Sequence, residues 1–79
     1  MEKSTAFVLI RAKPGHERDV YYSLARRERF IEIHPVVGEF SVVAKIVADD
    51  LERIGYIILE EMGNIENVDS YQTLMATTP

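Results

Sequence analysis

The hydrophobic positions of the chain follow two periods, which separate predicted strands from predicted helices. Alternation with a period of two marks residues 5–13 and 40–48, and strand-forming residues also dominate residues 30–37 and 68–76. These four segments are predicted to be strands. The first has one uniformly apolar face and one mixed face, a pattern typical of a strand that is covered on both sides. Its apolar face consists of Ala6, Val8, Ile10 and Ala12.

A period of three to four residues predicts a helix over residues 16–29. Val20 and Leu24, with Tyr21 beside them, form its inner stripe, and charged residues occupy the remaining positions. Pro14 and Gly15 separate this helix from the preceding strand.

A second helix is predicted to begin at Asp49 and Asp50. An Asp cap followed three residues later by Glu52 can satisfy two free backbone N–H groups reciprocally. Gly63 is expected to end the helix in a left-handed conformation. The apolar residues between these ends recur at helical spacing and are Leu51, Ile54, Ile58 and Met62.

The resulting order, β-α-β-β-α-β, predicts an α+β ferredoxin-like fold with a four-stranded antiparallel sheet and two helices on one face. Pro35 cannot donate a ladder hydrogen bond, and it falls on the second strand, which this topology places at a sheet edge. Gly38 and Glu39 are expected to turn the chain between the second and third strands in chain order. The uncovered sheet face would be half apolar, so we expect it to pair with a second copy as a sheet-to-sheet dimer. The residues expected in this dimer interface are Phe7, Leu9, Val43 and Val47.

Composition favours a single domain, residues 1–79, that gains stability by association. The chain has 79 residues and no cysteine, so neither disulfides nor thiolate metal sites can stabilise it. Its net charge of −4 has the wrong sign for a nucleic-acid surface. The densest basic stretch, residues 25–29, contains an acid. It is expected to lie in the last turn of the first helix, where cations interact favourably with the helix dipole.

The chain shows no targeting segment. Its N-terminal apolar run, residues 6–10, is too short for a signal peptide and ends at Arg11. No stretch approaches the length of a membrane span. We therefore expect a cytoplasmic protein without membrane contact.

The ionisable residues offer little catalytic machinery. His16 and His34 lie eighteen positions apart without a third partner. The adjacent acid pairs at 49–50 and 60–61 diverge on a helix, which predicts solvated faces rather than acid/base pairs. No serine has a recognisable nucleophile context, and the spacing supports neither a metal site nor a cofactor. The residues therefore predict a protein that is not an enzyme.

The run HPVVGEFSVVAKIVADDLERIGYIILEEMGNIENV, residues 34–68, resembles the C-terminal effector domain, or RAM domain, of the Lrp/AsnC transcriptional regulators. The resemblance includes the Val-x-Gly-x-aromatic-x turn at 36–41, the Asp-initiated second helix and the Asn67-Val68 entry to the last strand. It extends to the first strand, so it covers nearly the whole chain. Family members usually carry a helix-turn-helix that binds DNA. This chain has no room for one, so the resemblance implies a stand-alone domain that does not bind nucleic acid directly.

The resemblance also implies a site and an assembly. These domains pair sheet to sheet, the dimers commonly assemble further, often into octamers, and small molecules, typically amino acids, bind between dimers. Glycine in the turn lets the backbone approach such a ligand closely. The family often has Asp at Ser41 and Gly at Asn67, which bears on recognition of a ligand ammonium by the turn. The ligand-binding positions implied are Gly38, Glu39, Phe40, Ser41, Asp69, Tyr71 and Thr73.

Three interpretations of function remain open. The first is a domain that senses an amino acid or a related small molecule and reports it by changing its assembly, acting through a partner such as a full-length Lrp/AsnC regulator. The second is a dimeric enzyme of the small monooxygenase type, which needs polar groups between helices and sheet. That space is predicted to be apolar. The third is a structural assembly module without a ligand, in which the turn at 38–39 is only a hairpin connection.

Overall fold

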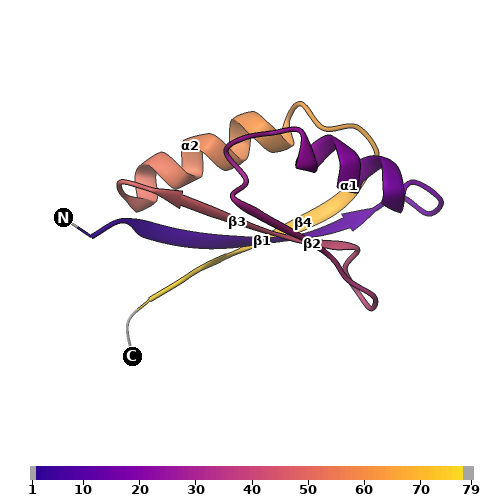
Figure 1. The fold of residues 1–79 in the computed structure, drawn as a ribbon, viewed down its shortest axis with the longest axis horizontal. Helices are drawn as coiled ribbons and strands as arrows, with labels where there is room; N and C mark the ends of the chain where they lie inside the picture. The colour runs from indigo at the N-terminus through magenta and orange to yellow at the C-terminus, as the bar shows by residue number, and fades with distance from the viewer. Residues whose placement is uncertain (1, 78–79) are drawn as a thin grey trace.

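The computed structural model describes residues 2–77, which fold into one sheet covered by two helices (Figure 1). Both helices lie on the same face of the sheet and leave the other face open. The strand order is β2-β3-β1-β4, and all neighbours are antiparallel. This confirms the predicted ferredoxin-like α+β fold, with Pro35 on the edge strand β2. The elements in chain order are β1 (Ser4–Ala12), α1 (Glu17–Ala25), β2 (Glu32–Pro35), β3 (Val42–Ala48), α2 (Leu51–Met62) and β4 (Val68–Met75).

The core lies between the helices and the covered face of the sheet. Alternate residues of β1 and β3 face each other across the ladder, as in the pairs Ala6 with Ile46 and Val8 with Ala44. All four of these side chains are fully buried. Both helices contribute the residues that were expected to face the core, with one exception. Leu51, at the start of α2, is exposed. The helical and connecting residues in the core are Val20, Leu24, Phe30, Ile54, Ile57, Ile58, Met62 and Ile65.

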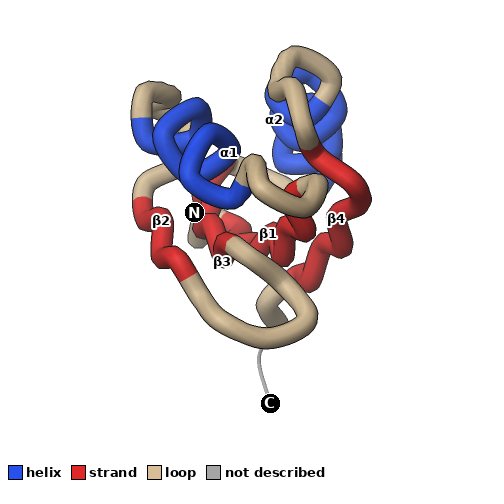
Figure 2. Tube along the Cα trace, turned by 90° about the vertical axis from the view of Figure 1, so that its right-hand side faces the viewer, coloured by secondary structure: helices blue, strands red, loops and turns tan. Residues whose placement is uncertain are grey.

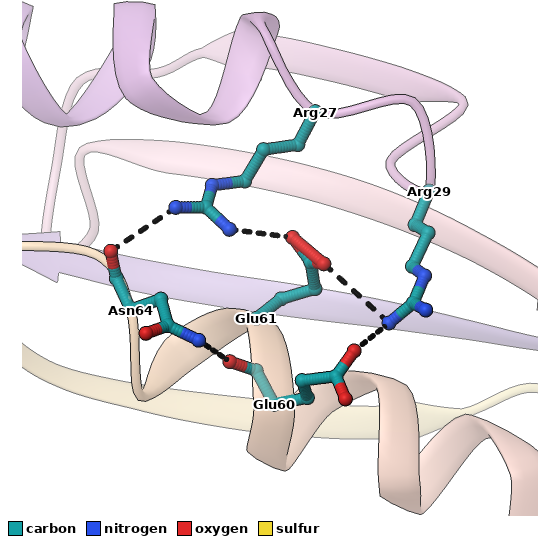
Figure 3. Close-up of polar contacts among 5 residues, drawn as sticks. All are labelled: Arg27, Arg29, Glu60, Glu61 and Asn64. Carbon is teal, nitrogen blue, oxygen red and sulfur yellow. Dashed lines mark hydrogen bonds and ion pairs between the residues drawn. The ribbon is translucent and has the colours of Figure 1, made fainter.

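The basic stretch after α1 does not lie in a helical turn. The helix ends at Ala25, and the Arg27 N–H closes it by donating to the Leu24 carbonyl at 3.0 Å. Arg27 and Arg29 instead reach across to α2 (Figure 3). Arg26 is the C-cap of α1, whereas Arg27 and Arg29 lie beyond the helix and pair with residues of α2, so the expectation that the whole stretch lies in its last turn was wrong.

Glu61 on α2 receives these arginines and is buried. Arg27 donates from Nη1 to Glu61 Oε1 at 2.8 Å and from Nη2 to the Asn64 carbonyl at 3.0 Å. Arg29 pairs with Glu60 and lies 3.5 Å from Glu61 Oε2 (Figure 3). The prediction of a solvated face holds for Glu60 and was wrong for Glu61, whose carboxylate can be buried because two guanidinium groups compensate its charge.

The ends of α2 use different residues from those expected. Asp50 is the N-cap and accepts from the Arg53 N–H at 2.8 Å, whereas Asp49 pairs with Lys3 at 2.7 Å. The residue three positions after the cap is thus an arginine, so no reciprocal capping box forms. Gly63 is right-handed, with φ −70°, and the prediction of a left-handed stop was wrong.

The left-handed residue of this region is Asn67, with φ 65°, immediately before β4. Asparagine tolerates this conformation better than most side chains. The Asn67 carbonyl accepts from the Lys13 N–H at 2.8 Å, which fixes the start of β4 beside the end of β1.

Candidate functional site

The loop between β2 and β3, residues 36–41, hangs from the sheet on the side away from the helices (Figures 1 and 2). The Val36 N–H donates to the Ser41 carbonyl at 2.9 Å and closes the loop. Gly38 has φ +142°, which side-chain-bearing residues rarely adopt, although no atom lies within 4 Å of the position of an added Cβ. Backbone conformation, and not lack of space, therefore requires glycine here.

Arg11 of β1 holds this loop from the open side of the sheet. Its Nε donates to the Glu39 carbonyl at 3.0 Å, and its Nη2 contacts Glu39 Oε1 at 2.9 Å. Its guanidinium carbon also lies 5.6 Å from the centre of the Phe40 ring. Three contacts from one arginine thus fix the orientation of two of the predicted ligand-binding residues.

Ser41 ties the loop to the central strand. Its N–H donates to the Ile10 carbonyl at 2.8 Å, and its Oγ accepts from the Ala12 N–H at 3.2 Å. The hydroxyl is therefore part of the contact between β3 and β1, and its O–H remains available as a donor.

The predicted ligand-binding residues of β4 lie on the other side of β1 from the loop. Tyr71 pairs with Ile10 and Thr73 with Val8, so both side chains point to the helix side of the sheet. A bulge opposite Arg11 and Ala12 leaves Asp69 as the extra residue. The strand and loop residues come from one end of the sheet, but a single chain does not bring them together around one pocket.

The open face carries the predicted dimer residues. Leu9 pairs with Val43 across the β1–β3 ladder, and Phe7 and Val47 lie on the same face, since they alternate with the residues buried under the helices. All four are only partly buried in the single chain. Leu74 extends this apolar surface onto β4, opposite Phe7. The expectation that these side chains share the uncovered face is confirmed.

Charged residues border the open face at β2 and β3. Glu32 Oε1 lies 3.2 Å from His34 Nε2, and its Oε2 accepts from Lys45 Nζ at 3.2 Å. The hydrogen bond with His34, followed by that with Lys45 and the charge of Lys45, lowers the pKa of Glu32. Glu32 therefore stays ionised beside the apolar surface.

A groove lies at the other side of this edge, between α1 and β2. It has a volume of about 410 Å³ and is lined from α1 by Arg18 and Tyr22, from the sheet edge by Pro35, and from the loop ends by Val36 and Ser41. The sequence did not identify the residues of α1 that line this groove. The spacing of Arg18 and Tyr22 does not distinguish them from residues on an ordinary exposed helix face.

The space between helices and sheet gives no support to a catalytic cleft. Ala6, Val8, Ile10, Ala44 and Ile46 fill it and are fully buried. Within residues 2–77, no group of three His, Asp or Glu side chains is arranged to hold a metal ion. None of the helices in this part of the chain is long and apolar enough to cross a bilayer.

Comparison with sequences identifies relatives among transcriptional regulators. An uncharacterised HTH-type transcriptional regulator of Pyrococcus horikoshii is 33% identical over 76 residues, which are 92% of this chain and 51% of the relative. The HTH-type regulator FL11 of Pyrococcus furiosus is 29% identical over 70 residues, 89% of this chain and 46% of that protein. The chain thus spans about half the length of the curated relatives it matches.

Comparison with solved structures finds the same fold in other proteins. TTHA0845 from Thermus thermophilus is 26% identical with a TM-score of 0.84, covering 96% of this chain and 95% of that one. FFRP-DM1 is 27% identical with a TM-score of 0.83, covering 94% and 99%. The fold of Escherichia coli AsnC matches with a TM-score of 0.84 at 16% identity, covering 96% of this chain and 52% of AsnC. The model of the Lrp/AsnC ligand-binding domain matches residues 5–78, and the chain belongs to this family.

Proposed function

We propose that this domain binds an amino acid and responds by changing how its copies assemble. The observation that carries the proposal is the match of nearly the whole chain to the Lrp/AsnC ligand-binding domain. An amino acid is the ligand class to test first, because a Neisseria meningitidis regulator of the same fold was solved as an L-Met complex, with a TM-score of 0.78 at 13% identity. No cofactor or metal takes part in the proposed function.

The proposed assembly begins with a sheet-to-sheet dimer through Phe7, Leu9, Val43 and Val47, and continues to a higher oligomer such as an octamer. The dimer would remove a partly exposed apolar surface from water, at roughly 1.5–3 kcal/mol for each large side chain that becomes fully buried.

Assembly and ligand binding are coupled in this proposal by the position of β1. Gly38, Glu39, Phe40 and Ser41 lie on one side of this strand, and Asp69, Tyr71 and Thr73 lie on the other. A pocket that uses both sets has to form between copies of the domain. A ligand held by two copies stabilises their contact, because it binds only the assembled form.

The change in assembly would affect DNA binding through a partner in the cytoplasm, such as a full-length Lrp/AsnC regulator. The net charge of −4 supplies no attraction for phosphates, so the domain itself makes no specific DNA contact in this proposal.

A thermal-shift screen of the twenty amino acids, followed by sedimentation velocity with each stabilising compound, tests the proposal. A ligand at about a hundred times its dissociation constant should add roughly 2.7 kcal/mol to the free energy of unfolding. We expect at least one amino acid to raise the melting temperature and shift the sedimentation coefficient. If no compound does either, the domain is a ligand-free assembly module.

A further inference from the structure

The two edge strands of the sheet differ in how well they are protected against pairing with another chain. β2 lies at one edge and β4 at the other (Figure 2). Edge strands present unpaired backbone N–H and C=O groups, and short length, proline and lysine on the strand discourage another chain from binding them. β2 has four residues and includes Pro35. β4 has eight residues and contains neither proline nor lysine, so its edge is the open one.

The hydrogen-bond register shows which backbone groups of β4 point outward. The Ala76 N–H donates to the Thr5 carbonyl at 2.9 Å, and in an antiparallel ladder every second pair is bonded in this way. Phe7 and Leu74 form the next bonded pair in this register. The residues of β4 that alternate with the bonded ones therefore direct their N–H and C=O groups away from β1. They are Tyr71, Thr73 and Met75. Within residues 2–77, their N–H groups donate to no other element.

The same reasoning leaves β2 with a single outward N–H. The Val36 N–H donates to the Ser41 carbonyl, so the even-numbered residues of β2 bond to β3. The outward residues are Ile33 and Pro35, and proline has no N–H. An added strand would thus find three donors along β4 and one along β2.

A second copy of β4 fits this edge when the two strands run antiparallel about Thr73. A two-fold axis there places Thr73 opposite Thr73 of the second copy, and Tyr71 opposite Met75 of the second copy. Opposed threonines can hydrogen-bond, and a tyrosine ring packs well on a thioether. Tyr71 and Met75 are 39% and 43% exposed in the single chain, so both have surface left to bury. Asp69 is the only charged residue of β4, and in this register it does not lie opposite another acid.

We infer that β4 is an edge at which two copies of the domain join their sheets into one continuous sheet of eight strands, with Thr73 at the two-fold axis. The inference rests on the proposed function, which places Asp69, Tyr71 and Thr73 at a contact between copies, and it adds how the copies meet there. A contact along one strand is smaller than the roughly 1,200–2,000 Å² of a stable interface. It is therefore expected to link sheet-to-sheet dimers, each of which carries two such edges, rather than isolated chains at micromolar concentration.

Single-cysteine variants test the register, because the chain has no cysteine of its own. Opposed residues of a bonded antiparallel pair have Cα atoms about 5.5 Å apart, which a disulfide can span. Thr73→Cys should therefore cross-link two copies in oxidised glutathione. Tyr71→Cys should do so at least about tenfold more slowly, since its counterpart lies roughly 13 Å along the strand. A mixture of Tyr71→Cys and Met75→Cys should restore the cross-link, whereas Tyr56→Cys, exposed on α2, is the control and should not form one.

Hydrogen exchange of the unmodified chain tests the pairing without any substitution. In concentrated, assembled samples the amides of Tyr71, Thr73 and Met75 should exchange at least about tenfold more slowly than in dilute samples, where assembly is lost. The amides of Gln72 and Leu74 already bond to β1, so they are the internal control and should depend much less on concentration.

The outcomes separate this inference from the proposed function. Fast exchange of the three outward amides in an assembled sample would overturn the inference, and so would cross-linking of Tyr71→Cys as fast as that of Thr73→Cys. If an amino acid changes the assembly while these amides stay unprotected, only the inference fails. If the edges pair as expected and no amino acid changes the assembly, the proposed sensing function fails and the contact at β4 stands. Should Thr73→Cys not fold, hydrogen exchange of the unmodified chain decides.

Discussion

Glu61 shows how one charged residue connects two distant parts of the chain. Only 12% of its side chain is exposed, and it pairs with Arg27, 34 positions earlier. Glu61→Gln should lower the free energy of unfolding by about 1–2 kcal/mol, because it removes the charge that compensates partly buried guanidinium groups. The adjacent Glu60→Gln is the control and should cost less than about 1 kcal/mol, since Glu60 is exposed. Urea denaturation of both variants measures the difference, and equal costs would contradict this assignment.

Arg11 is predicted to govern the order of the loop rather than the stability of the fold. Arg11→Lys removes the paired contacts with Glu39 and the stacking on Phe40, which an ammonium group cannot reproduce. The ¹⁵N order parameters of residues 38–40 should then fall toward about 0.6, whereas that of Ser41, bonded to Ile10, should stay near about 0.85. Lys3→Gln breaks a surface pair elsewhere and serves as the control. An unchanged loop would show that Arg11 does not position it.

Ser41 illustrates the limit of predicting a site from sequence. The resemblance of the turn to the Lrp/AsnC family made it a candidate, and the structure adds that its hydroxyl accepts from the backbone N–H of Ala12, 29 positions earlier. A pairing over this distance depends on the register between β1 and β3, which no local pattern specifies. Ser41→Asp, which restores the residue common in the family, therefore changes a structural contact as well as the proposed site.

At the scale of elements, two adjacent aspartates at the start of α2 have different roles. Asp50→Ala should destabilise the protein by about 1 kcal/mol, because the Arg53 N–H loses its acceptor. Asp49→Ala should have a much smaller effect, since Asp49 is exposed and its ion pair with Lys3 lies on the surface. Thermal or urea unfolding of the two variants provides the comparison. A larger loss at Asp49 would mean that the helix begins one residue earlier.

The β2–β3 ladder is predicted to carry a pH-dependent contribution through Glu32. Its pKa lies below the usual 4.5, so the contribution is present above pH 4.5 and is lost as the pH falls through the folded-state pKa. The difference in urea midpoint between the unmodified protein and Glu32→Gln should therefore shrink as the pH falls below 4.5 and through the lowered pKa of Glu32. Glu28→Gln, which breaks no ion pair within residues 2–77, is the control. A difference that is constant over this range would disprove the contribution.

Element prediction succeeded where local pattern and tertiary structure agree. The apolar stripe of α2 predicted Leu51–Met62 correctly, and the alternation of β1 predicted its buried face. For α1 the prediction, residues 16–29, began one residue too early and ended four residues too late, because Arg and Glu favour continued helix whereas Arg27 and Arg29 pair with α2 instead. The strand character of β4 was likewise readable, but the face of Tyr71 follows from its register with β1 and the bulge at Arg11.

At the scale of the molecule, the open face and the candidate site share a boundary. Arg11 projects from the open face and contacts Glu39 and Phe40, so anything that packs on the sheet lies next to the loop. A change at the loop could therefore alter the proposed sheet-to-sheet contact through one side chain. This arrangement gives the proposed coupling between ligand and assembly a physical route within the chain.

The last prediction concerns the sheet-to-sheet dimer. Leu9 and Val43 face each other across the ladder at the centre of the open face, so Leu9→Lys with Val43→Lys would place two ammonium groups inside a dimer interface. We expect the unmodified chain to sediment as a dimer or larger at micromolar concentration and the double variant as a folded monomer, with its circular dichroism retained. Leu59→Lys, an equally large change at an exposed position of α2, should leave the dimer intact. A monomeric unmodified chain, or a double variant that still dimerises, would exclude this face as the interface.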